Sequence, residues 1–327
     1  MSAPKIAVVV VTKDAYELLR RNLEVLAAET ARSLYDLFIV DNGSRDRTVA
    51  FLKAVYPQAW LSCQKTNLGF ARAVNIALKQ ILQEKAHRYI LLLNVDIEVQ
   101  GRAVEKMLSF LEQCPEAAGV GPALILPDGS YQVGAGGYLP SLSRAAAYFF
   151  GFSTLFPGYV KGLFLEQRRG KRSNEAIEVD WLSGACLLAR RQVFEEVGLL
   201  DETFFFSVED IEWGWRLRKK GFKLFYWPEV AVLHHHGLVR ESFTPFDAAW
   251  VPNLFQLVKR EKGRKAAFLV RGLAIKGFML RLIFWTGRSL LARDKVKKSL
   301  ARKKQKQVST FLRASLSPSK YHVNFYR

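Results

Sequence analysis

The stretch Ile6-Ala7-Val8-Val9-Val10-Val11-Thr12 decides the fold class, because an unbroken apolar, β-branched run ends in a polar residue. Such a run is typical of a strand buried on both faces of a parallel sheet. A helical pattern follows over residues 15–30, and a second apolar strand spans Leu37 to Val40. Strands and helices alternating at this spacing predict a doubly wound α/β sheet.

The same alternation continues toward the C-terminus. The pattern predicts helices over residues 46–56, 70–86, 191–197 and 208–220, and strands over 59–63, 89–93, 222–226 and 230–235. Residues 127–180 are Gly-rich and aromatic, and we interpret them as a long, partly mobile insertion whose secondary structure the pattern does not reveal. In doubly wound sheets, ligands bind beyond the carboxyl ends of the strands. The residues that follow the apolar runs are therefore the candidates for chemistry.

The charge of the chain is concentrated at one end. The net charge is +19, and residues 257–327 hold 20 Lys and Arg against two acids, a net of +18. The first 256 residues are almost neutral, with 29 basic and 28 acidic side chains. The composition, half hydrophobic and 13% aromatic, excludes global disorder. We expect one nearly neutral globular body and one basic C-terminal region.

Cysteine usage and hydropathy indicate the compartment. Cys63, Cys114 and Cys186 are odd in number and lack metal-ligand spacing, which disfavours a disulfide framework and a cysteine zinc site. The apolar run after Met1–Lys5 is too short for a signal peptide, and no uncharged apolar stretch is long enough for a confident membrane span. These patterns favour a reducing, cytoplasmic setting.

Three strands of the predicted sheet end near a polar side chain, namely Thr12, Asp41 and Asp96. A carboxylate just beyond a buried strand can hold a hard divalent cation against phosphate oxygens. Asp and Thr are also ordinary turn residues, so the pattern leaves a structural role open. Gly69, just before a predicted helix, would let backbone approach an anionic ligand, although Asn-x-Gly before a helix is common.

The predicted helix 208–220 separates its acidic residues by face. At 100° per residue, Glu209 and Glu212 fall on a polar arc with Arg216, which we assign to solvent. Asp210 falls on the interior side, beside Trp213. A carboxylate there has a raised pKa, as a general base requires, although an N-terminal cap or a buried ion pair would also place it there.

The triplet His234-His235-His236 ends a predicted strand. Alternation places His234 and His236 on one face and His235 on the other. Neutral imidazole binds Mn²⁺-like cations, so one of these residues could join Asp96 at a metal, while exposed or packed histidines remain the alternative.

Seven motifs in order resemble glycosyltransferase family 2 enzymes with a GT-A fold, particularly the rhamnosyltransferase-like branch. They are Thr12, Val40-Asp41-Asn42-Gly43-Ser44-x-Asp46, Asn67-Leu68-Gly69-Phe70-Ala71, Leu93-Asn94-x-Asp96, Trp181-Leu182-Ser183-Gly184-Ala185, Glu209-Asp210-Ile211-Glu212 and Pro228-Glu229 with His234. The similarity covers residues 5–240. It implies a mostly parallel Rossmann-like sheet flanked by helices, and inverting, metal-dependent sugar transfer from a nucleotide diphosphate donor.

The resemblance also implies a role for each matching residue. The nucleotide-binding set would be Thr12, Asp41, Asn67, Gly69, Arg72 and Asn94. The acceptor-binding set would be Asp180, Trp181, Gly184 and Glu209. Asp96 and His234 would bind Mn²⁺ or Mg²⁺, and Asp210 would be the catalytic base. Residues 1–240 would form the catalytic domain, with a nucleotide-binding half over 1–100 and an acceptor-binding half over 101–240.

Two departures from the family pattern matter. Asn94-Val95-Asp96 has one carboxylate where many GT-A enzymes have two, which makes His234 more necessary as a ligand. Thr12 is followed by Lys13-Asp14 rather than Tyr-Asn, which bears on the nucleoside contacts. The Gln-x-x-Arg-Trp signature of processive synthases is absent from the sequence, so single addition is favoured.

The C-terminal region, residues 241–327, contains a helical pattern over Ala266–Leu291 in which basic and large apolar residues alternate. Long cationic side chains can snorkel, which suits a helix lying at a membrane interface. We expect this region to hold the enzyme at the inner face of the cell membrane, where a saccharide or polyprenyl-diphosphate-linked acceptor is presented. The alternative is a helix packed on the body and a solvated end.

Two other functions are compatible with parts of the sequence. A nucleic-acid-binding protein could use the basic C-terminal region, but this leaves Asp210 and the histidines unexplained, so no nucleic acid is expected. A sugar-nucleotide nucleotidyltransferase shares the α/β scaffold but would carry a Gly-rich, basic loop after the first strand. Residues 12–16 do not form one.

Overall fold

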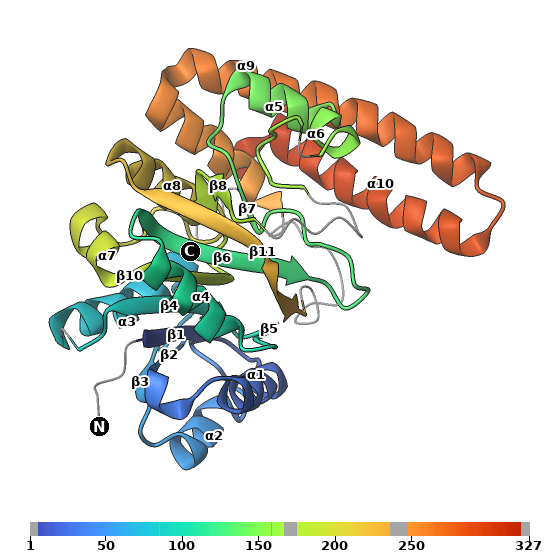
Figure 1. Cartoon of the computed structure of the whole chain (residues 1–327). Coiled ribbons are helices and arrows are strands. Elements are labelled where there is room, and N and C mark those ends of the chain that lie inside the picture. The colour runs from blue at the N-terminus through green and yellow to red at the C-terminus, as the bar shows by residue number, and fades with distance from the viewer. Residues whose placement is uncertain (1–5, 85, 158, 167–174, 236–247, 322–327) are drawn as a thin grey trace. The chain divides into compact units, whose positions relative to one another are not determined.

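The computed structural model describes the chain except residues 1–5, 85, 158, 167–174, 236–247 and 322–327 (Figure 1). By packing, it divides into two compact units. The first comprises residues 1–137, 167–205 and 209–239, and the second comprises 138–166, 206–208 and 240–327. Residues 138–166, which fall within the predicted acceptor-binding half, thus pack with the C-terminal region.

The first unit is built on a sheet whose N-terminal half is parallel. Its strand order begins β3-β2-β1-β4. The elements of this half are β1 (Ile6–Thr12), α1 (Tyr16–Glu29), η1 (Arg32–Leu34), β2 (Tyr35–Asp41), α2 (Thr48–Val55), β3 (Trp60–Cys63), α3 (Phe70–Glu84) and β4 (Tyr89–Asn94). The strands β1, β2 and β4 are almost fully buried, as their unbroken apolar runs predict. The predicted α/β class and this order of elements are confirmed.

The sheet continues beyond β4 as β10-β6-β11-β5. The elements of this half are β5 (Ile97–Glu98), α4 (Ala103–Gln113), β6 (Ala117–Ile125), β8 (Ile177–Val179), β10 (Cys186–Arg190), α7 (Arg191–Val197), α8 (Glu209–Lys219) and β11 (Lys223–His234). Strand β10 runs antiparallel to both β4 and β6, while β11 is parallel to β6. A separate two-stranded sheet pairs β7 (Gly136–Gly137) with β9 (Trp181–Leu182).

The prediction of two strands over 222–226 and 230–235 was wrong, because β11 is one strand of 12 residues. Its pairing with β6 shifts register between Trp227 and Ala231. Pro228, which has no amide proton to donate, lies in this gap between the paired residues. A local irregularity therefore absorbs the proline, and the strand continues to His234.

The second unit joins part of the predicted insertion to the C-terminal region. Its elements are α5 (Leu142–Phe149), α6 (Phe152–Leu155), α9 (Trp250–Leu291), α10 (Lys295–Leu316) and η3 (Pro318–Lys320). Gly263, with φ 85°, kinks α9. Residues 127–180 thus contain the helices α5 and α6 and the short strands β7 and β8, which the sequence pattern did not reveal.

Aromatic packing forms the core of the second unit. Phe149 and Trp250 both contact Phe278, which also packs on Phe311 of α10. Gly277 allows this approach, since a Cβ there would overlap the carbonyl of Phe149. The helix expected over Ala266–Leu291 is present, and one of its sides is covered by α5 and α10. No helix in the described ranges combines the length and the apolar character that crossing a membrane requires.

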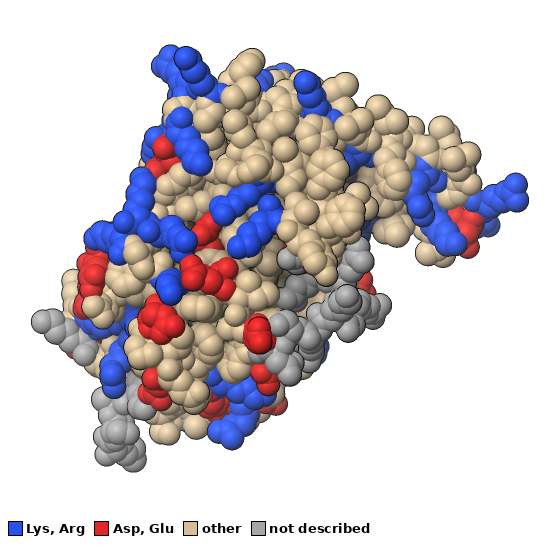
Figure 2. All heavy atoms as spheres, turned by 45° about the horizontal axis from the view of Figure 1, so that its top comes forward, with Lys and Arg blue, Asp and Glu red and all other residues tan. Residues whose placement is uncertain are grey.

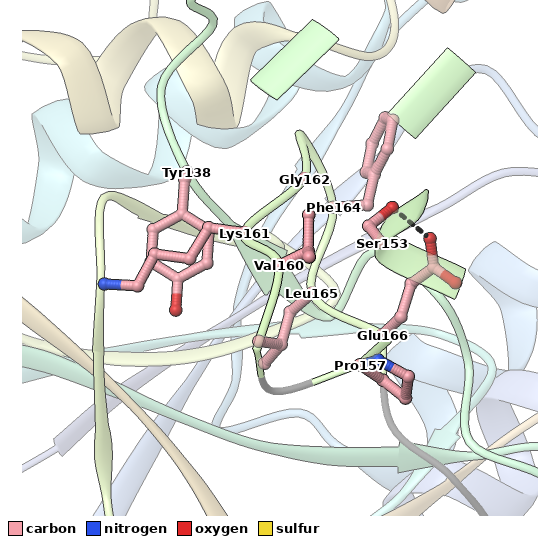
Figure 3. Close-up of a pocket in the computed structure, with 9 residues that line it drawn as sticks. All are labelled: Tyr138, Ser153, Pro157, Val160, Lys161, Gly162, Phe164, Leu165 and Glu166. Carbon is pink, nitrogen blue, oxygen red and sulfur yellow. Dashed lines mark hydrogen bonds between the residues drawn. The ribbon is translucent and has the colours of Figure 1, made fainter. Parts of the chain in front are cut away.

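A small pocket lies in the second unit, lined by Tyr138 before α5, by Ser153 of α6, by Pro157 and by residues between Val160 and Glu166 (Figure 3). Ser153 donates a hydrogen bond of 3.0 Å to Glu166 at its edge. The ammonium of Lys161 lies 4.8 Å from the centre of the Tyr138 ring. None of the predicted site residues lines this pocket, and all of them belong to the first unit.

Candidate active site

Thr12 and Asp41 lie side by side at the carboxyl ends of β1 and β2, where they are partners in the parallel register. Both side chains are buried. Asp41 Oδ2 accepts a hydrogen bond from the amide of Ser44 at 3.1 Å. Thr12 Oγ1 and Asp41 Oδ1, in contrast, have no hydrogen-bond partner in the described part of the chain. Because buried polar atoms are nearly always paired, such a couple at the ligand edge of the sheet is suited to a bound polar ligand.

Asn42 joins the end of β2 to the turn before α3. Its amide nitrogen donates to Asn67 Oδ1 at 2.9 Å, and its own oxygen accepts from the Leu68 amide at 2.8 Å. Asn67 Oδ1 in turn accepts from the Gly69 amide at 3.0 Å. Gly69 has φ +83°, and a Cβ there would lie 2.8 Å from the Phe205 ring. The Asn-x-Gly turn is therefore a rigid cradle beside the strand ends.

The remaining predicted nucleotide residues lie close to this cradle. Arg72 is in the first turn of α3, with its guanidinium 3.4 Å from Glu202. Asn94 is the last residue of β4, and its amide donates to the carbonyl of Ala185 at 2.8 Å. This bond ties the end of β4 to the turn that contains Gly184.

Asp96 and His234 meet at the far side of the same edge. The structure places Asp96 Oδ1 3.2 Å from His234 Nε2, and the exposed fractions of the two side chains are 12% and 4%. The other ring nitrogen, Nδ1, lies 2.5 Å from Gln132 Oε1. When Nδ1 carries the proton and donates its hydrogen bond to Gln132 Oε1, Nε2 directs its lone pair toward Asp96. The lone pair of His234 Nε2 and the carboxylate oxygen of Asp96 repel each other at this distance, and a cation bound between them removes the repulsion.

The donor pair fits a divalent cation bound together with a diphosphate. Two cis ligands of an octahedral ion, with bonds of about 2.1 Å, lie about 3 Å apart, close to the observed separation. The described residues contain no group of three or more His, Cys, Asp and Glu placed to hold a metal. Mg²⁺-like ions typically take only one or two protein ligands and complete their shell with phosphate oxygens and water.

A hydrogen-bonded cluster around the buried Glu98 supports the position of His234. Its neighbour His235 lies 2.5 Å from Glu98, and Arg21 also contacts Glu98. The amide of His235 donates to the carbonyl of Asp96 at 2.8 Å. This cluster closes the pairing of β11 with β5 and thus fixes the backbone on both sides of the Asp96–His234 contact. His236, the third histidine, lies outside the described residues.

Asp210 lies in the first turn of α8 and is half-buried. Burial raises the pKa of its carboxyl to about 6, although amides of Ile211 and Gly184 that hydrogen-bond to it partly oppose the shift. Ser207 and Val208, just before the helix, both have positive φ, 67° and 80°. That conformation is strained for a β-branched residue, and such strain is typical of functional segments. The carboxyl thus has the environment that a general base needs.

The assignment of Glu209 and Glu212 to the solvent face was wrong, because both are buried. Glu212 is held by Arg216, whose guanidinium also donates to the carbonyls of Val197 and Leu199. The loop after α7 therefore covers the arc that the helical wheel assigned to water. Glu209 Oε2 has no hydrogen-bond partner among the described residues, and burial together with the nearby charge of Asp210 raises its pKa well above the usual range.

The predicted acceptor residues pack around α8. Trp181 is buried in β9, and Asp180 lies 3.7 Å from Arg218, with the two oppositely charged side chains facing each other. Gly214 allows α8 to pack closely on β9, since a Cβ at this position would come within 2.6 Å of the Trp181 side chain. Gly184 lies against the ring of Phe70, which follows the Asn-x-Gly cradle.

A continuous set of contacts joins the donor side to Asp210. The cradle contacts the turn at Gly184 through Phe70, the amide of Gly184 hydrogen-bonds Asp210, and Ala185 in the same turn binds the end of β4. The structure therefore brings the predicted residues together at one edge of the sheet. Sequence reasoning missed Asn42 and Gln132 as site residues. Asn42 is part of the motif Val40–Asp46, whereas Gln132 is near His234 only in the fold.

Comparisons with known proteins identify the family of this chain. Residues 7–198 match the model of the family described as glycosyl transferase family 2. An N-acetylglucosaminyl-diphospho-decaprenol L-rhamnosyltransferase of Mycobacterium tuberculosis is 32% identical over 266 residues, covering 78% of this chain and 85% of that protein. A dTDP-rhamnosyl transferase, RfbF, of Shigella flexneri is 24% identical over 66% of this chain and 65% of that protein.

Two solved structures resemble the chain in fold, each with a TM-score of 0.57 and 13% identity. One is GalNAc-T7 with UDP, GalNAc and Mn²⁺, where the match covers 99% of this chain and 58% of that one. The other is the mannosyltransferase PcManGT from Pyrobaculum calidifontis with GDP-Man and Mn²⁺, where it covers 96% and 87%. From the family model, the relative above 30% identity and the shared architecture, this chain belongs to glycosyltransferase family 2 and has the GT-A fold.

Proposed function

We propose that this enzyme transfers a single sugar, rhamnose in the first instance, with inversion, from a nucleotide diphosphate donor to a saccharide or polyprenyl-diphosphate-linked acceptor. Its place would be the synthesis of a cell-surface polysaccharide. The names of the rhamnosyltransferase relatives support the sugar and the lipid-linked acceptor. The observation that carries the proposal is the half-buried Asp210, joined through Gly184 to the strand edge that holds Asp96 and His234.

On the donor side, Thr12 and Asp41 would hold the nucleoside, because each has a buried oxygen without a partner in the described chain. The Asn67–Gly69 cradle would bring backbone amides close to the donor at the start of α3. Arg72 would place its guanidinium there as well, and Asn94 would line the same edge at the end of β4.

Asp96 and His234 would hold Mn²⁺ or Mg²⁺, which would neutralise the negative charge that gathers on the departing diphosphate. Gln132 would keep the His234 ring in the tautomer that binds a cation through Nε2. With Asp96 and His234 as its only ligands among the described residues, the cation would depend on the donor phosphates to complete its binding.

Asp210 would accept the proton of the acceptor hydroxyl as its oxygen attacks the anomeric carbon. The bond from that carbon to the diphosphate oxygen breaks as the new glycosidic bond forms on the opposite face, which inverts the configuration. A pKa of about 6 keeps Asp210 ionised at neutral pH yet basic enough to take the proton. Asp180, Trp181, Gly184 and Glu209 would surround the acceptor, and burial raises the pKa of Glu209.

A lipid-linked acceptor is presented at a membrane. We therefore place the enzyme at the inner face of the cell membrane, with its basic C-terminal region against anionic lipid. The net charge of +18 in residues 257–327 supports this location.

The experiment that tests the proposal is a screen of nucleotide sugars, including dTDP-rhamnose, UDP and GDP sugars, for hydrolysis and for transfer to a lipid-diphosphate acceptor. We expect one donor to be turned over in the presence of Mn²⁺ or Mg²⁺. Turnover of a different sugar would replace rhamnose but keep the reaction class. Absence of turnover with every donor and acceptor, by a protein shown to be folded, would refute the function.

A further inference from the structure

Helix α9 exposes a row of large apolar side chains. Each has an exposed fraction of 49% to 83%, and they are Phe268, Leu269, Met279, Leu280, Ile283, Phe284, Leu290 and Leu291. At 100° per residue they fall within an arc of about 160°, and from Phe268 to Leu291 they extend about 35 Å along the helix. We call these eight residues the outer stripe. Monomeric soluble proteins rarely expose a continuous apolar surface of this extent.

The outer stripe is open along its length. A Cβ added at Gly272 or Gly287, which lie within the same arc, would meet no atom of the described chain within 4 Å. The opposite side of α9 is buried, with Ala274, Gly277 and Phe278 covered by α5 and α10. The helix therefore already has its core partners, and the outer stripe is a second apolar face.

Basic side chains lie within and beside this face. Lys265 and Lys276 fall inside the arc, and Arg288 lies beyond its margin, all three exposed. Figure 2, in which the top of Figure 1 comes forward, shows a broad area of residues other than Lys, Arg, Asp and Glu, with Lys and Arg at parts of its border. Lysine stems can lie along an apolar surface while the ammonium reaches phosphate groups above it.

We propose that the outer stripe of α9 is a membrane-binding surface that lies in the plane of an anionic lipid leaflet. This deepens the proposed function, on which it rests, because it names the surface that brings the enzyme to a lipid-linked acceptor. The apolar side chains enter the boundary between headgroups and acyl chains, and Lys265, Lys276 and Arg288 contact lipid phosphates.

Charge decides between a membrane and a second copy of this chain. In a symmetric dimer the same patch meets itself, so Lys276 of each copy would enter the partner's apolar face, within a region of net charge +18. An anionic leaflet instead neutralises every basic residue near it. Each contributes about a fivefold gain in membrane affinity.

The test is co-sedimentation of the full chain with vesicles of phosphatidylcholine, with and without phosphatidylglycerol. The variant is Leu280→Asp/Ile283→Asp, which changes two exposed residues at the centre of the stripe. Its matched control is Val55→Asp/Val133→Asp, two exposed valines of the first unit that receive the same charges. Circular dichroism checks that both variants fold, and analytical ultracentrifugation gives their oligomeric state.

We expect the wild type and the control to bind anionic vesicles, and the stripe variant to bind at least tenfold more weakly. Equal binding by the stripe variant would overturn the proposal, as would a wild-type dimer that the variant dissociates, or a preference for polynucleotide over vesicles. Transfer to a soluble acceptor should be unchanged in the stripe variant. Vesicle binding without any transfer would instead refute the proposed function and leave the surface standing.

Discussion

The replacement Asp210→Asn separates a catalytic carboxyl from a structural one. Asn keeps the size and hydrogen-bonding geometry of the side chain but cannot take a proton from the acceptor. We expect kcat to fall about 10²- to 10⁴-fold, the contribution typical of a positioned general base. The Kd of the nucleotide sugar should stay within twofold, because the donor residues lie on other elements.

The same change should stabilise the fold, by an amount that depends on pH. Raising the pKa of Asp210 from its ordinary 3.8 to about 6 costs the ionised, folded enzyme about 3 kcal/mol. The protonated acid carries no such cost. The unfolding free energy of the wild type therefore falls by about 3 kcal/mol as the pH rises from about 4 through 6. The asparagine side chain of the variant is neutral throughout. We therefore expect a gain in unfolding free energy of up to about 3 kcal/mol at pH 8 and none at pH 4.

The assay combines steady-state kinetics from pH 5 to 8 with thermal unfolding at pH 4 and pH 8. Wild-type kcat should rise through an apparent pKa of about 6, which belongs to the Glu209–Asp210 pair rather than to one residue. Glu112→Gln, an exposed carboxylate on α4, serves as the control and should change neither quantity. Turnover by Asp210→Asn within tenfold of the wild type, or an equal stability difference at pH 4 and pH 8, would refute the reasoning.

Three further predictions concern the donor side. EDTA should abolish transfer, and added Mn²⁺ should restore it. Asp96→Asn should raise the Mn²⁺ concentration that gives half the maximal rate at least tenfold. A transfer rate that EDTA does not change would refute the metal-binding role of Asp96 and His234. Gln132→Leu should weaken Mn²⁺ binding 10- to 100-fold, measured by electron paramagnetic resonance with nucleotide present. Gln132→Glu keeps a hydrogen-bond acceptor for His234 Nδ1 and should retain the affinity. Equal losses of affinity in the two variants would show that Gln132 does not act by fixing the tautomer of His234. Gly69→Ala should raise the donor KM and lower the unfolding free energy by about 1–3 kcal/mol, since a Cβ meets Phe205 at positive φ; Gly101→Ala, also at positive φ but in open space, should leave KM unchanged.

Much of the first unit could be predicted because its pattern is local. The run Ile6–Val11 is almost wholly buried, and the helix over 191–197 was predicted with the bounds that the structure shows. The strand ends then indicated Thr12, Asp41 and Asp96, because parallel topology brings carboxyl ends to one edge. The proximity of His234 to Asp96 followed from family resemblance, and the structure places them in contact.

What the sequence could not reveal depends on distant packing. A helical wheel describes one helix alone, so it placed Glu212 toward water. The carbonyls that Arg216 reaches lie at the end of another helix, α7, and in the loop after it. Gln132 contacts His234 across 102 positions, without any periodic signal. The aromatic residues 148–164 looked like an insertion because their partners, Trp250 and Phe278, come about a hundred residues later.

The shared aromatic core of the second unit has a practical consequence for anyone who shortens this protein. Truncation near residue 240 would look like the removal of an appendage, yet it would strip Phe149 of Phe278 and leave Tyr148 and Phe164 without Trp250. The exposed aromatics would promote aggregation of the remaining fragment. A shortened protein should therefore keep both residues 138–166 and the C-terminal region or omit both. Mutations in either of these two segments limit the mutations that the other tolerates.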